Sequence, residues 1–486
     1  MEFKKNKLNI LLFGIFILGA VLRSYNINFN DLWSDEMVSF WVSDPDISFK
    51  ETLLRLFSSN WMVVYEISLK YFHYLFGYDV HVSRYFSSLI SLFSLIYFAI
   101  LLRHITNEKS QLLGFFLLSI NIYHIAYSIE LRSYILTFLL VTIFIYLNFK
   151  NKKTETNLNN LFLLKINFVL IIMLFCHPFT LLVVGSLIVF KIIEITNYKK
   201  INRQEILFII SLVVTSCIFL IIYFQTTMKI MNPSIFKGIS PDWMWQVKPS
   251  FYTNFYFSKF FGSRLLGIIY LATLLYCLCR FRKKILNEFD IYAFLVILIF
   301  ISYLVPLCFG YLFNPILIDR YIFYILIPII CVISHFIFYI EPIIVRYFII
   351  SLICLLTFFN NLLFESSFKQ FYTDIYPGKP EIKRTLKYIG NQSNKDFTFK
   401  RDDRYSINTN IIYENYLINY LKKIKSNSKY FSFKKKSELP SKFWLIYITD
   451  TNDETFKVPK KFENYYLSES KKFNRVEVHL LSTALN

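Results

Sequence analysis

The chain has 486 residues, of which 55% are hydrophobic and 20% aromatic, and its formal net charge is +20. This composition excludes a soluble globular protein of ordinary type and indicates a membrane protein. The positive charge does not indicate nucleic-acid binding, because the lysines and arginines cluster in the segments between apolar runs.

Apolar runs of roughly 17 to 25 residues recur from the amino terminus to about Phe364, and each is long enough to cross a hydrocarbon layer of about 30 Å. The first run, Leu8 to Val21, has no small-residue cleavage site after it, so we expect a retained helix and not a signal peptide. The pattern predicts a polytopic α-helical membrane domain with about eleven transmembrane helices in residues 1–364.

Basic residues mark every second connection between these runs. They lie at positions 4–7, 103–109, 150–153, 199–203, 280–284 and 346. Because cytoplasmic loops are enriched in Lys and Arg, we expect a cytoplasmic amino terminus. The external connections are then residues 24–83, the turns at Glu130 and His177, residues 225–260 and residues 310–319. With an odd number of spans, the residues after Phe364 then lie on the external side of the membrane.

Residues 365–486 differ in composition and predict a small extracytoplasmic α/β domain. Two alternating stretches, Phe443–Thr449 and Val476–Leu481, predict strands, and Pro380–Ile389 predicts an amphipathic helix. The many basic residues of this tail favour a position near anionic lipid or phosphate groups, although a solvated charged face has the same composition.

Two adjacent carboxylates, Asp35 and Glu36, follow Trp33 in the first external loop. This pattern is typical either of a solvated loop with an aromatic anchor at the membrane interface or of a catalytic site. Arg84 lies at the external end of the second span. Its long side chain either extends to the interface or pairs with a carboxylate of the first loop and keeps it ionised.

The turn between the third and fourth spans carries Glu130, Arg132 and Tyr134. Glu130 and Arg132 either contact a ligand or form an ion pair that caps the next helix. His177 lies in the turn after the fifth span, where a single histidine is more often structural than a ligand.

Arg320 and Tyr321 follow Asp319 at the external mouth of the tenth span. External arginines run against the positive-inside bias, so the arginines, carboxylates and histidine at this face predict a site for an anionic ligand. The chemistry suits glycosyl transfer. A carboxylate removes the proton of an acceptor hydroxyl, while arginines, or a divalent metal held by Glu130 and His177, neutralise a phosphate leaving group.

Several motifs are spread along the chain in a recognisable order: Leu18–Arg23, Leu32–Glu36, Arg84–Tyr85, Ser128–Tyr134 and Arg320–Tyr321. Together they resemble the bacterial branch of the dolichyl-phosphate-mannose protein mannosyltransferase superfamily. These are GT-C glycosyltransferases, similar to glycosyltransferase family 39 and related to the lipid A aminoarabinose transferases. The resemblance covers nearly the whole chain, is most specific near the amino terminus, and implies a GT-C fold.

The resemblance also implies roles for single residues. Asp35 matches the catalytic carboxylate, Glu36 is its neighbour and a partner for the acceptor or an arginine, and Arg84 matches an arginine that supports the acidic pair. After this loop the sequence differs from the family pattern, because Asn60–Tyr65 stands where the family has His-Pro-Pro. The resemblance therefore does not define the acceptor. The resemblance implies contacts with the donor or its phosphate for Glu130, Arg132, Tyr134, Arg320 and Tyr321.

We therefore expect an integral membrane glycosyltransferase, a hexosyl- or pentosyltransferase, with Asp35 as general base. It would transfer a sugar from a polyprenyl-phosphate donor to an extracytoplasmic lipid, glycan or protein acceptor, as a multi-pass protein of the inner (plasma) membrane. The alternatives are a flippase or transporter, which would place ionisable residues at mid-membrane, and a polymerase or ligase of lipid-linked saccharides. The identities of the sugar and acceptor do not follow from the sequence.

Overall fold

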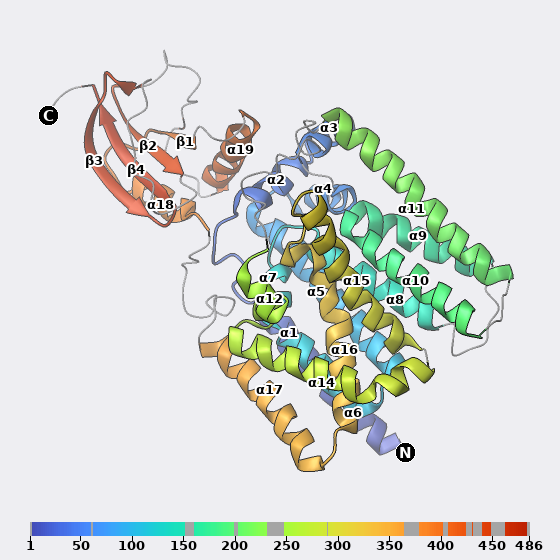
Figure 1. The fold of residues 1–486 in the computed structure, drawn as a ribbon. Helices are drawn as coiled ribbons and strands as arrows, with labels where there is room; N and C mark the ends of the chain where they lie inside the picture. Colours follow the sequence, from blue (N-terminus) through green and yellow to red (C-terminus); the bar gives the residue numbers. More distant parts are fainter. Residues whose placement is uncertain are drawn as a thin grey trace. The chain divides into compact units, whose positions relative to one another are not determined.

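The computed structural model describes residues 2–59, 62–150, 160–198, 203–230, 247–288, 290–363, 379–401, 407–423, 430, 440–448 and 462–483. The chain forms two compact units, the first of which is helical (Figure 1). The first unit comprises Met1–Tyr25, Phe49–Ser68 and Phe86–Phe368, and the second comprises Asn26–Ser48, Leu69–Tyr85 and Lys369–Asn486. The predicted boundary between residues 364 and 365 lies outside the described residues.

Two helices, α4 (Val63–Phe76) and α5 (Val80–Ile105), begin in one unit and end in the other. The remaining helices of the first unit are α1 (Glu2–Ser24), α3 (Phe49–Ser59), α6 (Glu108–Ser119), α7 (Ile122–Ser128), α8 (Tyr134–Lys150), α9 (Asn160–Cys176), α10 (Leu181–Tyr198), α11 (Arg203–Ile230), α12 (Pro249–Asn254), α13 (Phe257–Phe261), α14 (Arg264–Glu288), α15 (Ile291–Leu312), α16 (Leu326–Phe336) and α17 (Ile343–Leu363). Short 3₁₀ segments are η2 (Pro178–Thr180), η4 (Asp319–Ile325) and η5 (Ile337–Tyr339).

Within the described residues, seven helices are long and apolar enough to cross a membrane, and α8, α9 and most of α17 are shorter apolar helices. Large apolar side chains such as Ile210, Val214 and Ile218 are exposed along α11, as expected for a face that meets lipid. The chain is therefore a multi-pass membrane protein, and the predicted polytopic helical architecture is confirmed.

The structure differs from the prediction in two segments. The third span is split between α6 and α7, because the Asn121 side chain accepts a hydrogen bond from the His124 N–H and starts a new helix. Residues 24–83, predicted as one external loop, contain the helices α2 (Ser34–Val42), α3 and α4. The 14 residues of α4 are too few to span a bilayer, which requires about 20 residues.

A buried arginine ties the first helix to the helices that follow. Arg23 is fully buried, and its guanidinium donates to the carbonyls of Gly19, Leu118 and Ser119 and to Nδ1 of His124 at 2.7–3.2 Å. The carbonyls of Leu118 and Ser119 lie at the carboxyl end of α6, where regular helical partners are missing, and the arginine adds donors there to the Asn121 N–H that also bonds to Leu118.

The second unit contains α2, α18 (Ile382–Gly390), α19 (Ile407–Lys423) and a four-stranded sheet. The strands are β1 (Phe397–Arg401), β2 (Lys442–Ile448), β3 (Tyr466–Phe473) and β4 (Val476–Ser482), in the order β1-β2-β4-β3. β1 runs parallel to β2, and the other neighbours are antiparallel. The predicted strands correspond to the central pair β2 and β4, and the predicted helix corresponds to α18, so the small α/β domain is confirmed.

Close packing of α13 against α14 generates a prediction about stability. A Cβ atom at Gly267 would lie 2.7 Å from the Phe257 carbonyl carbon and 2.8 Å from Ser258 Cα, so Gly267→Ala must push the two helices apart. Overpacking of this kind costs about 1–3 kcal/mol. We expect a lower midpoint of thermal unfolding in detergent, measured by the amount of monodisperse protein left after heating.

Gly185→Ala is the matched control, because a Cβ at Gly185 in α10 meets nothing within 4 Å. Alanine favours a helix over glycine by about 1 kcal/mol, so this variant should unfold at the same temperature as the native chain or higher. Equal midpoints for the two variants would contradict the packing described for α13 and α14.

Candidate active site

The loop that precedes α2 in the second unit is shaped by Arg84. This arginine is fully buried, and it donates to the carbonyls of Ile27 (3.0 Å), Asn30 (2.8 Å) and Asp31 (3.0 Å). Its Nη2 also lies 3.5 Å from Oε1 of Glu36. Of the two predicted roles for Arg84, pairing with a carboxylate of the first loop is therefore confirmed.

The Glu36 carboxylate binds groups in the protein interior and does not reach the surface. Its side chain is fully buried, and Oε2 accepts hydrogen bonds from the Trp33 N–H (3.2 Å) and from Nζ of Lys379 (2.6 Å). The first of these contacts closes the amino-terminal turn of α2. Glu36 is therefore an anchor for α2, and its predicted partnership with an arginine is confirmed.

Asp35 is the more accessible of the two adjacent carboxylates. It lies in the first turn of α2 and is partly exposed, whereas Glu36 is fully buried. A carboxylate in the first turn is stabilised by the partial positive charge of the helix amino terminus. Of the predicted acidic pair, Asp35 is therefore the carboxylate that solvent can reach.

A second buried acid, Asp31, belongs to the same loop. Oδ1 accepts a hydrogen bond from the Tyr416 hydroxyl at 2.8 Å, and Oδ2 accepts one from the Lys383 backbone N–H at 3.0 Å. Burial raises the pKa of the Asp31 carboxyl, and the nearby Lys383 opposes this shift. We did not predict roles for Asp31, Lys379 or Lys383, because only the folded tail brings the lysines to this loop.

In the first unit, three distant segments bring the second predicted group of residues together. The Tyr134 ring lies 5.7 Å from the His177 ring and 6.4 Å from the Tyr321 ring, and His177 and Tyr321 are 5.2 Å apart, measured between ring centroids. The Arg132 guanidinium lies 5.9 Å from the centroid of Tyr134, and that of Arg320 lies 5.7 Å from Tyr321. The structure thus brings Tyr134, His177 and Tyr321 together, each with its ring near another, while their role in binding an anionic ligand stays a prediction.

His177 has a structural task in this cluster. Its Nδ1 accepts a hydrogen bond from the Phe179 N–H at 3.3 Å and caps the short η2 segment. Burial lowers the pKa of His177 to about 3, with a further contribution from the charges of Arg132 and Arg320. The imidazole is therefore neutral at physiological pH, and the positive charge of the cluster comes from the arginines.

Glu130 and His177 were predicted to hold a divalent metal. Among the residues that the structure describes, no group of three or more His, Cys, Asp and Glu side chains is arranged for a metal ion. The two arginines that lower the pKa of His177 also disfavour a cation beside it. These surroundings suit an anion better than a metal, and the metal-binding role of Glu130 and His177 stays a prediction.

Asp319 adds an acidic group beside the arginine cluster. Its carboxylate lies near the hydroxyls of Tyr123, Tyr127 and Tyr256. Asp319 and Arg320 are both partly exposed at the start of η4. This surrounding of tyrosine hydroxyls was not predicted, because the tyrosines come from α7 and from the segment between α12 and α13.

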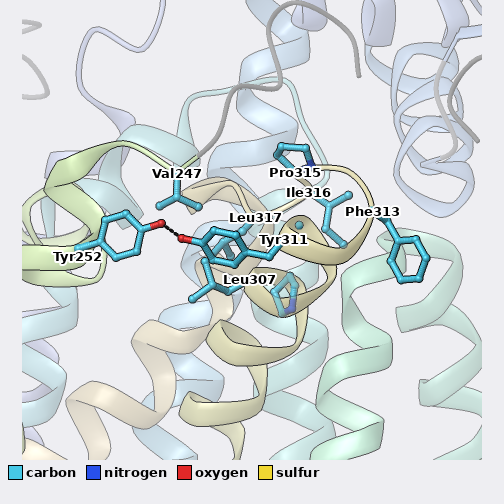
Figure 2. A pocket seen from close by; sticks show the side chains of 10 residues that line it. Val247, Tyr252, Leu307, Tyr311, Phe313, Pro315, Ile316 and Leu317 are labelled. Carbon is cyan, nitrogen blue, oxygen red and sulfur yellow. Dashed lines mark hydrogen bonds between the residues drawn. The ribbon is translucent and has the colours of Figure 1, made fainter. Parts of the chain in front are cut away.

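A cavity of about 180 Å³ is lined by residues that precede Arg320 in the sequence (Figure 2). Leu307, Ile316 and Leu317 help to line it, and Leu317 precedes Arg320 by three residues. Figure 2 shows the hydroxyls of Tyr252 and Tyr311 pointing toward one another, where they form a hydrogen bond. The cavity therefore combines apolar side chains with the polar hydroxyls of two tyrosines.

Comparisons with known proteins bear on the fold. No protein-family model matches the sequence, and no curated protein sequence is significantly similar to it. Among solved structures, the chain is similar to ArnT from Cupriavidus metallidurans in the apo state, with a TM-score of 0.59 and 8% identity over 98% of each chain.

Two structures of an archaeal oligosaccharyltransferase are also similar. AglB from Archaeoglobus fulgidus, in complex with an inhibitory peptide and a dolichol-phosphate, has a TM-score of 0.48 at 12% identity over 96% of this chain and 62% of that chain. The Archaeoglobus fulgidus oligosaccharyltransferase tethered to an acceptor peptide has a TM-score of 0.45 at 11% identity, over 95% and 62% of the two chains. At such low identity a likeness shows the fold and not the reaction. From the likeness to ArnT, the chain has a GT-C fold over nearly its whole length.

Proposed function

We propose that this protein is an integral membrane glycosyltransferase. It transfers a sugar from a polyprenyl-phosphate donor to an extracytoplasmic lipid, glycan or protein acceptor. The observation that carries this proposal is the pair of arginines, Arg132 and Arg320, that flank a buried neutral histidine in a membrane protein of GT-C fold. Charged residues are costly near a membrane, and two arginines that both act on one buried histidine give this part of the chain a positive potential that favours an anionic ligand such as a lipid phosphate.

The reaction needs a base and a group that binds the departing phosphate, and the chain supplies candidates for both. Asp35 accepts the proton of the acceptor hydroxyl while the acceptor oxygen forms a bond to the anomeric carbon. The bond from the anomeric carbon to the phosphate oxygen breaks, and the lipid phosphate leaves with the electron pair. Arg132 and Arg320 neutralise the negative charge that develops on this phosphate.

The remaining predicted residues contribute to binding. Tyr134 and Tyr321 lie beside the two arginines and offer hydroxyl and ring contacts to the donor. The cavity lined by Leu307, Ile316 and Leu317 is a candidate site for the first isoprene unit of the lipid (Figure 2). The distribution of Lys and Arg supports a cytoplasmic amino terminus and an extracytoplasmic tail in the inner membrane.

Replacement of the proposed base gives the first test of this function. Asp35→Asn keeps the size of the side chain and removes its basicity, so sugar transfer should fall by about 10² to 10⁴-fold. The measurement is transfer of a radiolabelled sugar from a polyprenyl-phosphate donor to an acceptor in proteoliposomes. The control is Asp46→Asn, because Asp46 is an exposed carboxylate of the same loop region.

If the Asp35→Asn variant transfers sugar at the native rate, Asp35 is not the base. Movement of the labelled lipid across the bilayer without any transfer, by the native chain, would instead favour a flippase.

A second prediction concerns the arginine cluster. Arg132→Ala removes a charge-assisted contact to the donor phosphate worth about 1.5–3 kcal/mol, so the KM for the donor should rise by about 10- to 100-fold. Dependence of the initial rate on donor concentration measures this effect. Arg264→Ala, at an exposed arginine at the start of α14, should leave the KM unchanged. An unchanged donor KM and kcat in Arg132→Ala would contradict the proposed phosphate site.

A further inference from the structure

The loop of residues 27–33 has no regular secondary structure, and side chains from elsewhere in the second unit hold its shape. Arg84 binds three of its carbonyls, as described above. Lys383 Nζ donates to two loop carbonyls, those of Asn28 (3.0 Å) and Asn30 (3.2 Å). The carbonyls of residues 27, 28, 30 and 31 therefore find partners in the side chains of Arg84 and Lys383 and not in a sheet.

Two lysines from the tail also meet the two buried carboxylates of this segment. Lys379 contacts Glu36 at 2.6 Å, and Lys383 lies 3.9 Å from Asp31 through Nζ and 3.0 Å from it through its backbone N–H. Tyr416 in α19 adds its hydrogen bond to Asp31. These contacts join positions more than 340 residues apart in the chain.

The segment that carries the lysines is itself attached to the sheet. Asn474, in the turn between β3 and β4, donates through Nδ2 to the carbonyl of Lys379 at 2.7 Å. The backbone N–H of Asn474 donates to the Glu381 carboxylate at 3.0 Å, and its carbonyl accepts from the Glu381 N–H at 3.1 Å. A continuous series of contacts thus leads from the sheet through Lys379 to Glu36, the residue next to Asp35.

We propose that the carboxyl-terminal domain positions the catalytic carboxylate, with Lys379 and Lys383 as positioning residues that hold residues 27–36 in the shape that presents Asp35. This inference rests on the proposed function, because Asp35 is the base of that reaction. The tail then has a direct task in catalysis although it supplies no group that reacts. Loss of Lys379 leaves Glu36 with the longer contact to Arg84, and loss of Lys383 removes the lysine beside Asp31, so each change weakens the charge balance of a buried acid and lets the loop move.

Hydrogen–deuterium exchange of the full-length protein in lipid nanodiscs tests this contact without any substrate. Lys379→Met and Lys383→Met should each increase exchange in peptides that cover residues 27–42. Lys387→Met is the matched control, because Lys387 is an exposed lysine in the same helix, α18. Exchange in residues 27–42 that equals that of the native chain in both lysine variants would overturn the inference.

The transfer assay supplies the second readout. Lys379→Met should lower kcat by about 10- to 100-fold with an unchanged KM for the donor, because the base is misplaced and the phosphate site is intact. The double variant Glu36→Gln, Lys379→Met removes both charges of the pair, and it should recover protection from exchange and part of kcat. A double variant no better than Lys379→Met in both readouts would contradict the role of the charge pair.

If Lys379→Met does not fold, Tyr416→Phe and the double variant carry the same test, since each removes less from the buried network. Tyr416→Phe should raise exchange in residues 27–42 by a smaller amount. The two proposals fail differently. If the native chain transfers no sugar from any polyprenyl-phosphate donor, the proposed function falls, whereas the exchange result still decides whether the tail lysines hold the loop.

Discussion

The buried carboxylate of Glu36 is the constraint on which the candidate active site depends. A carboxylate without solvent is tolerated only when cations and hydrogen-bond donors surround it, and loss of one partner of such a pair costs about 3–5 kcal/mol. Glu36 obtains its partners from Trp33, Arg84 and Lys379. Three parts of the second unit must therefore be in place together before α2 can begin where it does.

In the first unit the charge that acts on His177 is positive, because it comes from two arginines and not from a carboxylate. Arg132 and Arg320 lie near a histidine whose pKa is lowered to about 3, so the protein adds no third positive charge there. A neutral imidazole beside two guanidinium groups leaves their field directed at a ligand and keeps their mutual repulsion from growing. The rings of Tyr134 and Tyr321 lie beside these arginines, with their centroids 6.4 Å apart.

Much of this architecture could be predicted from the sequence, and the reasons differ between elements. The membrane helices, α18 and the strands β2 and β4 were predictable because their apolar residues recur with the period of a helix or fill a buried strand. The strands β1 and β3 and the helix α19 were not predicted. All eight residues of β3 except Phe473 are exposed, so no apolar alternation marks this edge strand.

Among the site residues, the pairing of Arg84 with the first loop was one of two alternatives predicted from its position at a span end, and a site formed by arginines, carboxylates and a histidine at the external span ends was also predicted. Lys379 and Lys383 could not be singled out, because the tail contains many lysines and only the fold selects these two. Asp31 lies close to Asp35 in the chain, but its burial depends on Tyr416, which is 385 residues away.

The opposite burial of Asp35 and Glu36 has a consequence for how an acidic pair in a helix is understood. Successive residues of an α-helix project about 100° apart around its axis, so neighbours in sequence cannot face the same substrate. Once Glu36 points inward, the rotational phase of α2 is set and Asp35 turns to the outside. Burial of the second acid of such a pair therefore fixes the direction in which the first acid projects, and moving the buried acid by one position would turn the exposed carboxylate into the interior.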